Sequence, residues 1–107
     1  MELPIVVKAL IDAKHENDSA KYTNCFSESA VVHDEGKVHS GKTAIKLWNE
    51  KTSREYQMLW QPLAYEGTSD DGTLTTKVSG TFPGSPITMK FHFGISNGLI
   101  ESLRMTD

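Results

Sequence analysis

Apolar residues recur at helical spacing at the start of the chain, which predicts a helix over residues 3–17. Pro4 suits the first turn of this helix, because its missing N–H costs nothing there. Asp18 can cap a second, short helix, which we expect to end near Glu28. The apolar stripe of the first helix consists of Leu3, Val6, Val7, Leu10 and Ile11.

A short apolar strand over residues 30–34 and a turn over residues 35–37 are expected next. An irregular return strand would lead from this turn to Ser40 and Gly41, which open a third helix that we end near Ser53. The residues of this helix that should face the core are Ala44, Ile45 and Trp48.

The second half of the chain predicts four strands, over residues 57–66, 73–82, 87–95 and 99–105. Pro62 in the first of them indicates an edge position or a bulge, because proline cannot donate to a central ladder. Turns are expected at residues 70–72 and 96–98. In the third strand every second residue is apolar, which predicts one apolar face made of Ile87, Met89, Phe91, Phe93 and Ile95.

Helices early in the chain and antiparallel strands late in it indicate an α+β fold, not a parallel βαβ fold. We expect a cone-shaped fold in which a curved antiparallel sheet wraps around the N-terminal helices and encloses a hollow. The 107 residues are an ordinary length for one domain, so residues 1–107 are expected to form a single domain. A chain this short has a modest core, and a partner subunit could restore burial lost to the hollow.

Charge and composition narrow the classes of function. The net charge is -3 and the basic residues are scattered, whereas nucleic-acid binding needs clustered positive charge. The longest apolar run is interrupted by Lys8 and is too short to span a bilayer, and no signal peptide is recognised. The lone Cys25 permits no internal disulfide and is expected to be a buried apolar residue. We therefore expect a cytoplasmic protein that binds neither nucleic acid nor membrane.

An ordered set of landmarks along almost the whole chain resembles a known superfamily. The landmarks are Asn17-Asp18, Phe26, residues 30–34, Gly41, Thr43-Ala44-Ile45, residues 80–86, Phe91-His92-Phe93 and residues 97–100. The set resembles a SnoaL-like domain of the nuclear transport factor 2-like superfamily, which also holds the ketosteroid isomerases. The resemblance implies a cone of one curved sheet and three helices, a pocket between them and often a homodimer.

Asp34 falls where the ketosteroid isomerases place their general base. A carboxylate in an apolar cavity has a raised proton affinity and can abstract a proton next to a carbonyl. The two oxyanion donors of those enzymes would fall at Leu10 and Phe91, and neither side chain can donate a hydrogen bond. Because oxyanion stabilisation is usually the largest catalytic contribution, the resemblance implies a pocket and an acid without steroid isomerase activity. The alternative for Asp34 is an acid that caps the hairpin or stays in solvent.

Aromatic and apolar residues are expected to line the pocket, because such side chains dominate ligand sites. Tyr22 could orient a ligand through its hydroxyl or serve helix packing, and Trp48, Tyr56 and Trp60 could be lining or core. No cofactor is expected. The predicted binding residues are Leu10, Tyr22, Val32, Trp48, Met89, Phe91 and Phe93.

The histidines give no metal motif. Strand alternation places Ala30, Val32 and Asp34 on one face, and His33 on the other. His39 lies across the turn from His33, but the spacing matches no strong ligand pattern, so no metal is predicted. His92 should face away from the pocket, towards solvent or a subunit interface, and His15 should be solvated.

Three functions stay open. The first is an enzyme of isomerase, cyclase or dehydratase type, with Asp34 as the base. The second is a non-catalytic binding module that uses the same hollow, which Leu10 and Phe91 favour. The third is a protein-interaction or dimerisation domain, which would bury the outer sheet face carrying Lys90 and His92.

Overall fold

The computed structural model describes residues 2–107 and contains three helices and one sheet. The helices are α1 (Ile5–His15), α2 (Ser19–Asn24) and α3 (Gly41–Glu55). The strands are β1 (Phe26–Asp34), β2 (Lys37–Ser40), β3 (Leu59–Gly67), β4 (Asp71–Ser79), β5 (Ile87–Ser96) and β6 (Leu99–Thr106). The sheet order is β2-β1-β6-β5-β4-β3, and only the β1–β6 pair is parallel.

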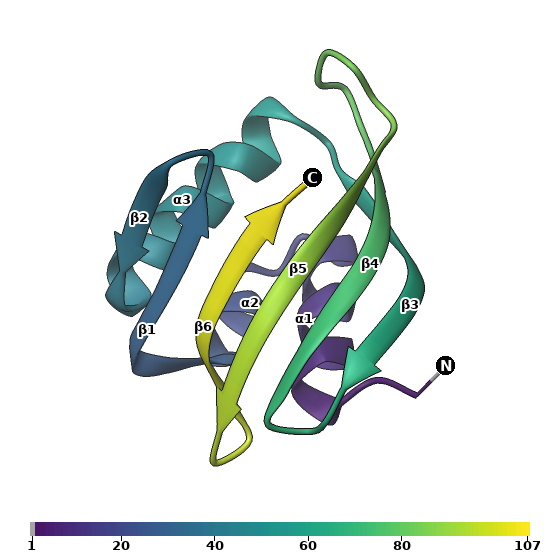
Figure 1. Ribbon diagram of the computed structural model, residues 1–107. Coiled ribbons are helices and arrows are strands. Elements are labelled where there is room, and N and C mark those ends of the chain that lie inside the picture. The colour runs from purple at the N-terminus through teal and green to yellow at the C-terminus, as the bar shows by residue number, and fades with distance from the viewer. Residues whose placement is uncertain (1) are drawn as a thin grey trace.

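The three helices lie against one face of the curved sheet (Figure 1). This arrangement confirms the predicted α+β cone of a sheet wrapped around N-terminal helices. The core lies between the two layers, since the apolar stripe of α1 and the inner faces of the strands meet there. Its largest fully buried apolar side chains are Tyr22, Phe26, Phe91, Leu10, Ile45, Leu74, Ile100 and Leu103.

The second helix is shorter than predicted. Asp18 caps it by accepting a hydrogen bond from the Lys21 N–H at 3.0 Å, as expected, but the helix ends at Asn24 and not near Glu28. β1 begins at Phe26 because its backbone pairs in parallel with Ile100 of β6, with a register shift before Val31. Local propensity does not reveal pairing with a strand more than 70 residues further along the chain, as between Phe26 and Ile100.

The hairpin turns follow local backbone preferences. Asn97 and Gly98 both have positive φ, and so do Glu35 and Gly36, which fits two-residue turns between antiparallel strands. The predicted turn over residues 70–72 lies earlier, because the Thr68 hydroxyl accepts the N–H groups of residues 70 and 71 and closes the turn there. β4 begins at Asp71, directly after this turn. It ends at Ser79, so the prediction that it reaches residue 82 is wrong.

β3 is an edge strand, as Pro62 predicted, and its register with β4 shifts between Pro62 and Ala64. His15, at the end of α1, is exposed but is not merely solvated. Its Nε2 accepts a hydrogen bond of 3.0 Å from the backbone N–H of Trp60 and so ties α1 to this edge.

None of the helices within residues 2–107 is long and apolar enough to cross a bilayer.

Candidate functional site

A cavity of about 410 Å³ lies between α3, the inner face of the sheet and the loop after β4. We call it the hollow. Its polar lining residues are Lys14, Asp34, Glu35 and Thr52. Its other lining residues are Trp48, Tyr56, Met58, Trp60, Val78, Phe82, Pro83, Ile87, Met89, Phe91 and Met105. Such a wall, apolar with a few polar groups, is typical of small-molecule sites.

Asp34 ends β1 and lines the hollow, half-buried. Burial raises the pKa of its carboxyl above the ordinary value, and the charge of neighbouring Glu35 raises it further. Hydrogen bonding to Trp48 acts in the opposite direction, as do the charges of His39 and Lys37. The carboxylate is therefore a stronger base than one in water.

His39 lies on the Asp34 side of the β1–β2 hairpin. Its register partner is Val32, while His33 pairs with Val38 and is exposed on the other face. The His39 ring stacks on Trp48 with 5.1 Å between the ring centroids. The pKa of His39 is lowered, chiefly by burial, and the nearby Asp34 charge acts in the opposite direction. Within residues 2–107, no group of three or more His, Cys, Asp or Glu side chains is placed to hold a metal ion.

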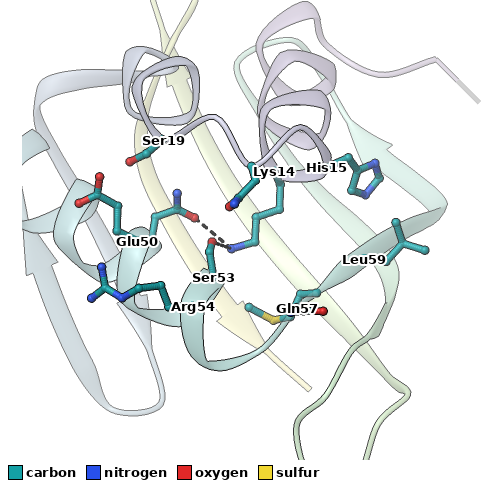
Figure 2. A pocket seen from close by; sticks show the side chains of 11 residues that line it. Lys14, His15, Ser19, Glu50, Ser53, Arg54, Gln57 and Leu59 are labelled. Atoms are coloured by element: carbon teal, nitrogen blue, oxygen red, sulfur yellow. Dashed lines mark hydrogen bonds between the residues drawn. The ribbon is translucent and has the colours of Figure 1, made fainter.

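Lys14 is a site residue that the sequence reasoning missed. It lies in the last turn of α1 with only 8% of its surface exposed. Its Nζ donates hydrogen bonds to Asn49 Oδ1 at 3.0 Å and Ser53 Oγ at 3.1 Å, both on α3 (Figure 2). Burial lowers its pKa to about 8. The spacing of Lys14 after Val7 and Leu10 continues the apolar stripe of α1, and this signal could have identified it as inward-facing.

Lys14 also reaches a second depression, a groove of about 940 Å³ between the end of α1, α3 and the start of β3 (Figure 2). This polar groove is lined by Lys14, His15, Asn17, Ser19, Asn49, Glu50, Ser53, Arg54, Gln57, Met58 and Leu59. Lys14 and Met58 line both cavities. Although the groove is larger, the hollow is more enclosed and more apolar, and it contains Asp34, so the hollow is the better candidate for a small-molecule site.

The structure brings together four of the predicted site residues around the hollow, namely Asp34, Trp48, Met89 and Phe91. Tyr56 and Trp60, predicted as lining or core, also line it. The other predicted residues are Leu10, Tyr22, Val32 and Phe93, which are buried and do not line the hollow.

Tyr22 packs beside the hollow, with its ring centroid 6.5 Å from that of Trp48 and 6.3 Å from that of Trp60. Its buried hydroxyl has no hydrogen-bond partner within residues 2–107. Burial raises its pKa, and the charges of Cys25 and Asp34 add to the rise.

Cys25 is buried as expected, and its thiol donates to the Lys21 carbonyl oxygen at 3.4 Å.

Solved structures with this fold include a proposed polyketide cyclase from Sinorhizobium meliloti, with 36% identity and a TM-score of 0.93 over 97% of this chain and 95% of that one. A nuclear transport factor 2-like protein from Cytophaga hutchinsonii is 15% identical, with a TM-score of 0.80 over 94% and 85% of the two chains. A protein with a ketosteroid isomerase-like fold from Catenulispora acidiphila, in complex with trimethylamine, is 17% identical, with a TM-score of 0.87 over 99% and 87%.

The chain belongs to the nuclear transport factor 2-like superfamily. No family model matches it, and no curated protein does either. Within this nuclear transport factor 2-like fold, Leu10 is fully buried in the core, and Phe91 forms part of the apolar wall of the hollow. Neither side chain can supply the oxyanion donors that the isomerase resemblance implies at these two positions.

Proposed function

We propose that the protein binds a small, largely apolar, carbonyl-bearing molecule in the hollow and uses Asp34 as a general base on it. The reaction class would be isomerisation, cyclisation or dehydration. The observation that carries this proposal is a half-buried carboxyl in the wall of an otherwise mostly apolar cavity. The similarity to a proposed polyketide cyclase supports this reaction class, and the trimethylamine complex of a protein with the same fold supports the binding of a small molecule.

The proposed step is abstraction of a proton from the carbon next to the carbonyl. Burial raises the pKa of Asp34, which makes its carboxylate a better proton acceptor. Hydrogen bonding to Trp48 and the charge of His39 act against that rise, because both favour the carboxylate form. A positioned base of this kind contributes roughly 10²- to 10⁴-fold in rate.

A second candidate function is non-catalytic ligand binding in the same hollow. It is favoured by Leu10 and Phe91, because a base without oxyanion donors at those positions lacks the usual largest contribution to catalysis. In this case Asp34 and Trp48 would orient the ligand, and nothing would be converted.

A thermal-shift panel of bicyclic and steroidal ketones on wild type and Asp34→Asn identifies the ketones that bind. Measuring the turnover of those ketones by both proteins then separates the two functions. The substitution keeps the shape of the side chain and removes the base. The enzyme predicts that a stabilising ketone still binds Asp34→Asn, while any turnover of that ketone is lost. Turnover unchanged in the variant would rule out Asp34 as the base. Binding without turnover by either protein would favour the second function.

The assembly that we propose is a homodimer formed through the sheet. The outer sheet face carries Lys90, which is exposed, and His92, whose ring nitrogens hydrogen-bond to the hydroxyls of Thr73 at 3.2 Å and Thr106 at 3.0 Å. A polar face with fixed hydrogen bonds is compatible with a wet subunit interface. A cytoplasmic location remains a prediction.

A further inference from the structure

Lys14 is a buried cation without an anionic partner. No carboxylate within residues 2–107 forms an ion pair with its Nζ at 4.0 Å or less. Its contacts are instead neutral, the amide of Asn49 and the hydroxyl of Ser53, with the rings of Tyr22 and Trp60 at 5.6 and 5.5 Å. A charge removed from water is costly unless it is paired, so this arrangement is incomplete electrostatically.

The hydrogen-bonding capacity of Lys14 is also incomplete. An ammonium has three N–H donors. Asn49 and Ser53 use two of them, and no third acceptor for Nζ is present among the described residues. Because Lys14 lines the hollow, an acceptor on a bound molecule could take the remaining N–H.

The rest of the hollow leaves one place for a negative charge. Of the residues that line it, Lys14 alone is basic, while Asp34 and Glu35 would repel an anion and the other walls are mostly apolar. A purely structural lysine would only tie α1 to α3. It would not need to border the apolar cavity.

We propose that Lys14 is the anion-binding group of the hollow, and that the natural ligand is an apolar molecule bearing a carboxylate that pairs with the Lys14 ammonium. This inference rests on the proposed binding function and narrows its ligand class. The carboxylate would lie at the Lys14 end, and the apolar body would extend along Trp60, Met89 and Phe91.

Two probes of nearly the same shape test this inference, 2-naphthoate and its neutral amide, 2-naphthamide. Isothermal titration calorimetry at pH 6.5 on the wild type should give at least about tenfold tighter binding of 2-naphthoate, since charge-assisted hydrogen bonds are roughly twice as strong as neutral ones. Equal affinities would overturn the inference and leave the apolar site standing. Binding of neither probe at millimolar concentration would overturn both.

The wild-type comparison needs no variant, and two substitutions locate the charge. Lys14→Met keeps the apolar stem and should lose the preference for 2-naphthoate while still binding 2-naphthamide. Lys8→Met is the matched control, because Lys8 lies on the same helix, is exposed and pairs with Asp12. It should bind both probes as the wild type does. Preference retained in Lys14→Met would place the anion elsewhere and contradict the inference.

Discussion

Lys14 and Asp34 are both partly removed from water, and burial shifts the pKa of each in the direction that favours the neutral form of the side chain. The Lys14 pKa falls from 10.5 to about 8, and the Asp34 pKa rises. The sign for stability follows from proton binding. Between pH 8 and pH 10.5 the unfolded chain holds the Lys14 proton and the folded chain releases it, so the Lys14 contribution to stability rises with pH in this window.

Lys14→Met should remove this pH dependence. We expect the free energy of unfolding of the wild type, relative to Lys14→Met, to rise by on the order of 2 kcal/mol between pH 7.5 and pH 10. Urea denaturation of both proteins at the two pH values measures this free energy. Subtracting the value for Lys14→Met from that of the wild type cancels the contributions of the other titrating groups. Parallel changes in the two proteins would show that Lys14 is not perturbed by burial.

Tyr22→Phe should be tolerated well. The buried hydroxyl has no partner, so its removal relieves desolvation and should leave the free energy of unfolding unchanged or raise it by up to about 1 kcal/mol. Tyr22→Ala is the contrast, since loss of the whole ring from the core should cost about 3–5 kcal/mol. If Tyr22→Phe alone costs more than about 1 kcal/mol, the hydroxyl has a partner that the structure does not contain.

Among the elements, the edge strand β3 shows which structural features the local sequence predicts and which it does not. Pro62 predicted an edge position or a bulge, because its missing N–H excludes it from a regular central ladder, and the structure has both. The hydrogen bond from Trp60 to His15 was not predictable, because it joins residues 45 positions apart. The early start of β1 was missed for the same reason.

His15→Ala should destabilise the protein by about 0.5–1.5 kcal/mol, because the edge N–H of Trp60 loses its acceptor. His33→Ala is the matched control, since His33 is exposed and makes no side-chain hydrogen bond to any described residue, and its effect should lie within about 0.5 kcal/mol of zero. Thermal unfolding of the three proteins at one pH measures both effects. Equal midpoints for the two variants would contradict a role of His15 at the strand edge.

For the molecule as a whole, the cone could be predicted because alternation along β5 and the ordered landmarks agree with one another. The period of two along β1 predicts that Asp34 faces inward, and in the structure Asp34 lines the hollow, while its role as a base stays a prediction. The pairing of Lys14 with α3 could not be predicted from the sequence, since its hydrogen-bond partners lie 35 and 39 positions further along the chain.

The proposed dimer is also a property of the whole molecule. One chain has a mass of 11.9 kDa, so sedimentation at micromolar concentration should give about twice that mass. If the outer sheet face is the interface, Lys90→Glu in the middle of it should shift the protein towards the monomer. A wild-type mass near that of one chain would contradict the dimer.

The central claim is that Asp34 acts as a base on a molecule held in the hollow, and proton exchange tests it most directly. If Asp34 is the base, the wild type should accelerate the exchange of the protons next to the carbonyl of 2-tetralone for deuterium in D₂O by at least about 10²-fold over Asp34→Asn, as followed by proton NMR. Asp34→Asn should still bind 2-tetralone. Equal exchange rates for two proteins that both bind the ketone would contradict the account.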